Sequence, residues 1–355
     1  MRASDLKYLL AYIIPVSGLI AVWQGGYYAP LTVIIAFGLI PLVEFFVVKS
    51  QINLTPELET DVSQIRYFDL LLYLNVPLVY GLLGLLLYRA TYTSVTTFEL
   101  YWMIASVGIV FGASGINVAH ELGHKPGRFE QLLSKMLLLP SLYLHFFIEH
   151  NRGHHVNVST PEDPATSRYG ENVYFFWVRS TVGSYVSAWK LEYDRLQKQG
   201  KGWLTWSNEM LRFQVIQLIY VAAIYAVFGT QGVMISIAVA IVGFLLLETI
   251  NYIEHYGLVR KKLASGRYER VQVRHSWNSN HEIGRIILYE LTRHSDHHYK
   301  ANRKYQVLRH HDESPQLPLG YPGSMLLSFV PPLWFAIMNP RLKQYKDTST
   351  DINMT

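Results

Sequence analysis

The stretch "FELYWMIASVGIVFGASGINVAHELGHK", residues 98–125, joins an apolar run to a pair of histidines. As a helix, residues 98–119 are long enough to cross a bilayer core about 30 Å thick. His120 and His124 follow at a spacing of four, which places both imidazoles on one helical face where they can share a metal. H-E-x-x-H is also the zinc protease pattern, in which Glu121 would act as a base. The stretch therefore predicts a membrane helix that leads into a metal site.

The composition of the whole chain is also that of a membrane protein. Of its 355 residues, 50% are hydrophobic and only 16% are charged, whereas soluble domains carry about 25% charge. The run at 6–23 is too long for the core of a signal peptide and no small-x-small cleavage site follows it, so we expect it to span the membrane. We predict an all-α integral membrane protein with six transmembrane helices, at 6–23, 28–48, 68–88, 98–119, 211–228 and 232–250.

The basic residues indicate which way the chain is oriented. The connections at 24–29 and 229–232 are uncharged, and 89–97 holds only Arg89. Most lysine and arginine lies in 120–210 and 251–355, so the positive-inside rule places these segments and both termini in the cytoplasm. The expected division of the chain is four spans in 1–119, a cytoplasmic segment at 120–210, two spans in 211–250, and a second cytoplasmic segment at 251–355 that completes a cap over the membrane.

Residues 132–148 are apolar enough to be mistaken for a seventh span. They contain Lys135, Pro140 and His145, and a crossing here would put 120–124 and 150–155 on opposite faces of the membrane. We therefore predict a re-entrant or interfacial hairpin.

Nine of the 14 histidines fall into four short clusters that this topology allows to meet. A catalytic zinc takes three protein ligands, so nine imidazoles are too many for one such ion, whereas two metals with four or five nitrogens each would use them all. Imidazole suits zinc, copper, iron and nickel, so the ligand type leaves the metal open. The predicted ligands are His120, His124, His150, His154, His155, His255, His294, His297 and His298.

Several acids adjoin these histidines and have two possible roles. A ligating histidine usually donates its second N–H to a carboxylate or carbonyl, which fixes the orientation of the ring; the alternative is a helix-capping or salt-bridging acid. The candidates for orienting a ligand are Glu121, Glu149, Asp163, Glu254 and Asp296, with His281 as a further candidate. The remaining histidines, at 145, 275, 281, 310 and 311, are predicted not to be ligands.

The chain contains no cysteine. This excludes disulfides, thiolate nucleophiles and cysteine-ligated iron, iron–sulfur clusters included, within the chain. Nor is a haem, a flavin or a nucleic-acid partner expected.

Four motifs resemble those of a known family. "HELGHK", "EHNRGHH", "NYIEHYGL" and "LTRHSDHH" are similar to the histidine motifs of membrane-bound alkane 1-monooxygenases, within the class of integral-membrane di-iron hydroxylases and desaturases. The resemblance covers about 112–340 and includes "TPEDPATSRYGE", "HSWNSNH" and "LPLGYPG". The form "NYIEHYGL" favours alkane and xylene hydroxylases over fatty-acyl desaturases.

The resemblance implies a non-haem di-iron centre held by the nine histidines, with O2 as co-substrate and terminal hydroxylation of n-alkanes that enter from the bilayer. It also implies a bacterial inner membrane and a separate rubredoxin, reduced by an NAD(P)H-dependent reductase, as electron donor. Rubredoxins are generally acidic, so a basic face is expected to dock one; its candidate residues are Lys125, Arg128, Arg152, Arg260, Lys261 and Lys262. The positive-inside rule alone is an alternative explanation of these cations.

Other functions remain alternatives at this stage. One is an intramembrane zinc protease with Glu121 as its base, which would bind about one zinc per chain. A desaturase, epoxidase or xylene-type methyl hydroxylase on the same di-iron site is another. A metal transporter or sensor would need polar residues along the spans, and these are scarce apart from Glu44 and Asp69.

Overall fold

The computed structural model describes residues 2–47 and 49–352, and in these ranges its regular elements are all helices, with three isolated β-bridges. The predicted all-α fold is therefore confirmed. Residues 1, 48 and 353–355, which lie at the edges of predicted segments, are outside the described residues.

Five helical stretches are long and apolar enough to cross a membrane, judged by length and composition. The first four follow one another in the N-terminal part of the chain. They comprise Ala3–Gln24 (η1, Ala3–Tyr12, and α1, Ile13–Gln24), Gly26–Phe46 (η2, Gly26–Tyr28; α2, Leu31–Ile34; η3, Ile35–Leu39; α3, Ile40–Phe46), Arg66–Tyr92 (α5, Arg66–Tyr73, and α6, Asn75–Tyr92) and Thr97–Gly123 (α7, Thr97–Val110; η4, Phe111–Ile116; α8, Asn117–Gly123). The short α4 (Pro56–Ser63) lies between the second and third.

The fifth stretch, α13 (Glu209–His255), is a bent helix of 47 residues. A straight helix of this length would measure about 70 Å, more than twice the bilayer core. Gly229 interrupts the helix with φ 63° and ψ −166°. Residues that carry a Cβ avoid this backbone conformation. The two limbs correspond to the predicted runs at 211–228 and 232–250, so each of the six predicted runs is mainly helical over its described residues. Two further helices, α16 (Tyr321–Ser328) and α17 (Pro331–Ile352), are together long and apolar enough to cross a membrane, but the chain bends by 119° between them.

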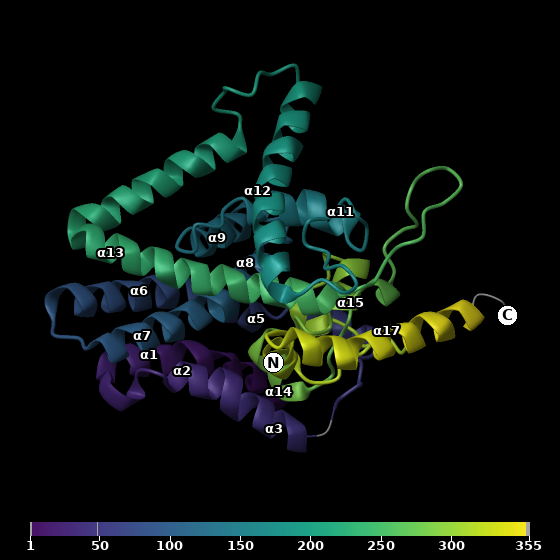
Figure 1. Cartoon of the computed structure of the whole chain (residues 1–355), viewed down its shortest axis with the longest axis horizontal. Helices are drawn as coiled ribbons and strands as arrows, with labels where there is room; N and C mark the ends of the chain where they lie inside the picture. The colour runs from purple at the N-terminus through teal and green to yellow at the C-terminus, as the bar shows by residue number, and fades with distance from the viewer. Residues whose placement is uncertain (1, 48, 353–355) are drawn as a thin grey trace.

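Small residues bring α7, η4 and the second limb of α13 into close contact. A Cβ added at Gly108 would lie 2.4 Å from Val242 Cβ, and one added at Gly243 would lie 2.8 Å from Phe111 Cβ. Figure 1 shows α1, α6, α7 and this limb running side by side, with α12 crossing α13 at a steep angle. The packing aligns the ends of α8 and α13, so that His120 and His255 are carried to the same end of the bundle.

Residues 132–148 do not form one continuous helix. α9 (Arg128–Leu138) ends in a turn in which Leu142 has φ 51°, and α10 (Phe146–Glu149) follows. α9 packs on α8. The hairpin's position in a membrane and the other segment boundaries stay predictions.

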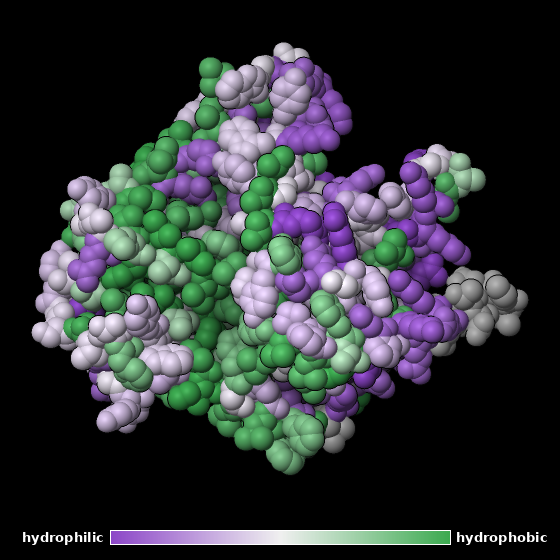
Figure 2. Space-filling model, in the orientation of Figure 1, coloured by the Kyte–Doolittle hydropathy of each residue, from purple (hydrophilic) through white to green (hydrophobic). Residues whose placement is uncertain are grey.

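The remaining elements cover the end of the bundle where the histidines lie. They are η5 (His150–His154), α11 (His155–Asn157), α12 (Val173–Lys198), η6 (Val273–His275), α14 (Glu282–Ile287), α15 (His294–Tyr299) and η7 (Tyr305–Val307). Figure 2 shows hydrophobic surface over the bundle and hydrophilic surface gathered at the side of this cover. The molecule thus has an apolar body and a polar end.

Candidate metal centre

The nine predicted ligand histidines lie together in two groups, although they come from residues 120 to 298. Within each group the nitrogens that could bind a metal all lie within 4.8 Å of one another. α15 contributes His297 to one group and His294 and His298 to the other. The larger group comprises His120, His124, His150, His155 and His297, and the smaller group comprises His154, His255, His294 and His298.

In the five-histidine group the Nε2 atoms form a connected series. His150 Nε2 lies 3.1 Å from that of His124 and 3.0 Å from that of His155; His297 Nε2 lies 3.2 Å from that of His155 and 2.8 Å from that of His120. Two nitrogens bound about 2.1 Å from one ion at a right angle are separated by about 3 Å. The spacing is therefore that of ligands to a shared metal.

Hydrogen bonds alone do not explain this packing. A neutral imidazole has one N–H and one lone pair, so a ring nitrogen with two nitrogen neighbours cannot satisfy both. Burial lowers the pKa of His124 to about 3, and burial with the charges of neighbouring histidines lowers the pKa values of His155 and His297 well below normal. Neutral rings with converging lone pairs fit a cation, and a metal ion is the cation that imidazole groups bind.

The four-histidine group has the same form. His298 Nε2 lies 3.2 Å from His154 Nε2 and 2.8 Å from His294 Nε2. His255 Nε2 is buried and has no hydrogen-bond partner among the described residues. The two groups adjoin, because the His155 and His298 rings stack with their centroids 4.4 Å apart. The arrangement fits two neighbouring metal ions.

Asp163 fixes the ring of His154. Its Oδ2 lies 2.9 Å from His154 Nδ1 and also accepts a hydrogen bond from Thr166, while Oδ1 accepts from the backbone N–H of Ala165. Burial alone raises the pKa of Asp163, but the charge and hydrogen bond of His154 bring it below normal. The carboxylate therefore holds the His154 Nδ1 proton and directs Nε2 toward the other histidines.

Glu254 approaches the four-histidine group differently from Asp163. Its Oε2 lies 3.1 Å from His294 Nε2, the same nitrogen that faces His298. Its Oε1 accepts a hydrogen bond from Tyr321 at 2.7 Å. Glu254 therefore presents an oxygen beside the metal-binding nitrogens instead of holding a second N–H. Sequence reasoning did not single out Tyr321, although its "LPLGYPG" was noted as a family-like stretch.

The other four residues predicted to orient a ligand contact other groups. Glu121 accepts a hydrogen bond from the Tyr305 backbone N–H, and Glu149 accepts one from Ser187 Oγ. His281 contacts Ser279. Asp296 bonds to Arg303, His311 and the Arg309 backbone N–H. These contacts do not include the nine histidines, so proximity in sequence was a poor guide to which acid touches a ring.

The five histidines predicted not to be ligands lie outside both groups. His275 and His310 pair with Glu269 and Asp312, at 3.3 and 3.1 Å. His145 packs on the ring of Tyr143 at 4.3 Å. These neighbours give each of the three a structural environment without a metal.

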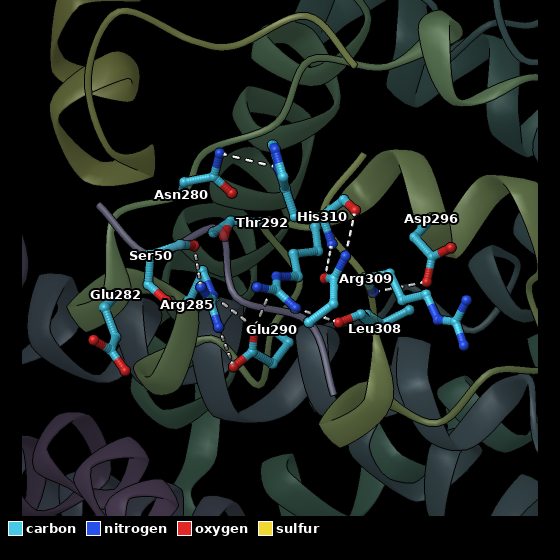
Figure 3. A network of polar contacts seen from close by, with 12 residues as sticks. Ser50, Asn280, Glu282, Arg285, Glu290, Thr292, Asp296, Leu308, Arg309 and His310 are labelled. Carbon is cyan, nitrogen blue, oxygen red and sulfur yellow. Dashed lines mark hydrogen bonds and ion pairs between the residues drawn. The ribbon is translucent and has the colours of Figure 1, made fainter. Parts of the chain in front are cut away.

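A network of ion pairs fixes the approach to α15 (Figure 3). Glu290 is buried, and its Oε2 accepts a hydrogen bond from Arg285 Nε at 2.7 Å. The same oxygen lies 3.7 Å from Arg293 Nε. Arg285 also donates to the Ser50 carbonyl, which ties the linker after α3 to this region. Glu290 adopts φ 58°, a strained value that the network holds in place. The network sets the start of α15 and so the position of three histidines.

Two adjoining cavities lead from the bundle to the histidines. The first has about 530 Å³ of empty space and an entirely apolar lining contributed by α1, η3, α13, α14 and α16 among others; Phe37, Ile109, Leu246, Ile287 and Met325 belong to it. The second, of about 340 Å³, is lined by His120, His150, His294 and Glu254. Both cavities have Gly112 and Ile250 in their walls. The apolar cavity thus adjoins a second cavity whose wall includes histidines of both groups.

The predicted basic docking face is only partly free. Lys125 pairs with Asp69 at 2.5 Å, and Arg152 pairs with Glu192 and Glu209. Arg260 is buried and donates to the carbonyls of Val156 and Glu269. Arg128, Lys261 and Lys262 are exposed. Lys125 and Arg260 therefore take part in internal contacts, whereas Arg152 is paired and also exposed. Docking by this basic face stays a prediction.

Comparisons with known proteins agree on one class. A family model described as fatty acid desaturase matches residues 96–326. Alkane 1-monooxygenase 2 of Pseudomonas aeruginosa is 42% identical over 89% of this chain and 84% of its own length. Alkane 1-monooxygenase 1 of Alcanivorax borkumensis is 39% identical over 93% and 82%. The xylene/toluene monooxygenase hydroxylase component XylM of Pseudomonas putida is 29% identical over 96% and 89%.

Proposed function

Because the chain belongs to the alkane 1-monooxygenase family, we propose that it hydroxylates the terminal carbon of n-alkanes to primary alcohols with O2. The observation that carries the proposal is the junction of an entirely apolar cavity with two adjoining groups of buried histidines. An alkane has no polar group to recognise, so an apolar cavity is the binding site that its chemistry requires.

The two histidine groups are proposed to hold one iron ion each, with five and four nitrogens. Iron supplies, when bound, the O2 chemistry that an unactivated C–H bond requires and that protein side chains lack. Asp163 keeps His154 Nδ1 protonated so that its Nε2 is free to bind, and Glu254 adds an oxygen beside His294.

The cavity determines which carbon reacts. An alkane partitions into lipid by about 0.8 kcal/mol for each CH2, and the cavity walls come from helices with the composition of membrane spans. Gly112 and Ile250 line both the first cavity and the cavity at the histidines, so they stand on the proposed path of the alkane. This passage presents the end of the chain before its middle and supports terminal selectivity. The apolar walls also exclude water from the reacting carbon.

The proposed setting is a bacterial inner membrane, with both termini and the metal centre on the cytoplasmic side. The basic segments support this orientation through the positive-inside rule. Electrons are proposed to come from a separate rubredoxin, which an NAD(P)H-dependent reductase reduces. The exposed Arg128, Lys261 and Lys262 suit an acidic partner.

The test is product analysis with purified protein, rubredoxin, its reductase and NADH. Octane, hexadecane and p-xylene are supplied separately under 18O2, and products are identified by mass spectrometry. We expect 1-alkanols that carry one 18O atom. Alkenes would instead indicate a desaturase, and turnover of p-xylene alone would indicate an aryl-methyl hydroxylase.

Two matched histidine variants connect the activity to the metal centre. His255→Ala removes a nitrogen of the four-histidine group, and His281→Ala removes a buried histidine outside both groups whose ring contacts Ser279 Oγ. We expect His255→Ala to lose alcohol formation and bound iron, and His281→Ala to retain both. Equal activity of the two variants would contradict the proposal.

A further inference from the structure

Hydroxylation with O2 consumes protons as well as electrons. One oxygen atom enters the C–H bond and the other leaves as water, which takes two electrons from the donor protein and two protons: RH + O2 + 2 e⁻ + 2 H⁺ → ROH + H2O. The histidine groups are largely buried, so protons must reach them through polar side chains or water. The need for such a proton route rests on the proposed function.

Glu248 is a buried carboxyl that the metal centre does not use. It lies on the second limb of α13, two turns before His255, and is 1% exposed. Its Oε1 accepts a hydrogen bond from Tyr143 OH at 2.7 Å, whereas its Oε2 has no partner among the described residues. The carboxyl is thus held at one oxygen and free at the other. The titratable groups nearest to it are Tyr143 from the turn after α9, Glu149 from α10 and His154 from η5.

The Glu248 carboxyl is one side chain away from the cavity at the histidines. Asn251 follows Glu248 by one helical turn and lies beside its carboxyl. Asn251 also lines the cavity, together with His120, His150 and His294. Its amide offers a hydrogen-bond donor and an acceptor to a water molecule in that cavity. Glu248 therefore has a short polar connection to the place where protons are consumed.

The Glu248 carboxyl also faces α12. Ser180 Oγ and Thr181 Oγ1 on α12 are buried without a partner among the described residues, and Ser180 lies beside the Glu248 carboxyl. Tyr143 packs on His145, whose ring meets Tyr185 at 5.3 Å. Tyr185 is 37% exposed. Unpartnered hydroxyls in a row are the groups that buried water molecules bridge.

We propose that Glu248 relays protons from the α12 side of the molecule, through Tyr143 and Ser180, to the cavity at the histidines. Glu248 takes a proton on one carboxyl oxygen from the α12 side and releases one toward Asn251. It thereby returns to its starting state, and two such transfers supply one turnover.

The test compares Glu248→Gln, which cannot take up and release a proton, with Glu248→Asp, which can. Alcohol formed, O2 consumed and H2O2 released are measured in iron-loaded protein, with rubredoxin, reductase and NADH, in H2O and in D2O. Loss of a positioned proton donor lowers turnover by about 100-fold, so we expect Glu248→Gln to fall by that order and to release H2O2 in place of alcohol. Its solvent isotope effect should exceed that of the wild type, and Glu248→Asp should recover most of the alcohol yield per O2.

Two matched controls separate a relay from a structural role. Glu44→Gln alters another buried carboxyl with an unpartnered Oε2 in an apolar helix, and Tyr220→Phe alters a phenol whose buried OH has no partner among the described residues. Both should keep the wild-type ratio of H2O2 to O2, whereas Tyr143→Phe should raise it. If Glu248→Gln does not bind two irons, the result for Tyr143→Phe is used to test the relay.

A wild-type alcohol yield per O2 in Glu248→Gln, or in Tyr143→Phe where that variant decides, would overturn the relay, as would equal H2O2 release by Glu44→Gln. The ratio is also measured without alkane. If the wild type oxidises no alkane, the proposed function is refuted. The ratio of H2O2 released to O2 consumed, compared between the wild type and the variants, still tests the relay.

Discussion

At the residue scale, Asp163 shows how a loop carboxylate can determine the quality of a metal site. It is buried, accepts hydrogen bonds from its own loop, and contacts one ring nitrogen of His154. We predict that Asp163→Asn weakens binding of one of the two metal ions by about 10- to 100-fold. Chelator competition with metal analysis would measure this, with the exposed neighbour Glu162→Gln as control. Wild-type affinity in Asp163→Asn would show that the loop does not orient the ring.

His145 gives the fold a predictable response to acid. Burial lowers its pKa from 6.5 to about 3, so the folded protein keeps it neutral where the unfolded chain would protonate it. The contribution of neutral His145 to the free energy of unfolding is therefore fully present above pH 6.5. It is lost as the pH falls toward 3, by about 1.4 kcal/mol per pH unit.

We predict that His145→Phe makes the unfolding free energy less dependent on pH between 6.5 and 4. Thermal or denaturant unfolding of metal-free protein in detergent, across this range, would check it. The wild type is the reference for this comparison. A His275 variant would not serve as a control, because His275 pairs with Glu269. Identical slopes for the two proteins would contradict the assignment.

At the scale of elements, Gly229 determines the shape of α13. Its φ of 63° and ψ of −166° are costly for any residue with a Cβ, by about 1–3 kcal/mol. We predict that Gly229→Ala destabilises the protein by this amount in unfolding titrations. Gly81→Ala is the matched control, because Gly81 lies within α6 and nothing stands within 4 Å of its added Cβ. Equal stability of the two variants would show that the bend does not need glycine.

Gly112 of η4 lines both cavities and so lies on the proposed path of the alkane. A Cβ there would already meet Leu246 Cβ at 3.2 Å, so a larger side chain must project into the passage or displace the helices. We predict that Gly112→Leu lowers kcat/KM for octane and hexadecane by on the order of 100-fold, as expected when a substrate is misplaced.

Metal analysis should find two ions in Gly112→Leu, since no histidine is altered. Gly84→Leu, at a position in α6 with open space around it, should leave kcat/KM near the wild-type value. Full activity in Gly112→Leu would mean that alkanes reach the histidines by another way.

At the scale of the whole molecule, hydropathy predicted the helices well but not their geometry. The six apolar runs are helical because burying backbone polar groups in lipid leaves few alternatives. The strong bend at Gly229 and the π-helical η4 were not foreseen, since glycine alone does not specify a conformation.

The histidine motifs were equally informative about which residues meet. Spacing and topology sufficed to bring nine side chains together. The acids were harder to assign, because Asp163 and Glu254 contact histidines of the two groups while Glu121 and Asp296 do not. This difference depends on tertiary contacts, such as that of Glu121 with the Tyr305 backbone. The apolar cavity draws on many separate elements, and no local pattern reveals such a space.

The predicted sidedness of the molecule has a direct test, which the absence of cysteine simplifies. Thr230 and Ser265 are exposed and lie in predicted external and cytoplasmic connections. We predict that Thr230→Cys reacts with a membrane-impermeant maleimide in intact cells whose outer barrier is opened, and that Ser265→Cys reacts only in inverted vesicles. Labelling of both from one side would contradict the six-span topology.

α15 supplies nitrogens to both histidine groups and comes late in the chain. During synthesis, neither group is complete until the ribosome has passed residue 298, when the apolar helices have already left the tunnel. A complete site can therefore bind metal only after the apolar helices have been made. If the two groups hold iron as proposed, a cell short of iron would accumulate inserted but inactive protein, which a later supply of iron could activate without new synthesis.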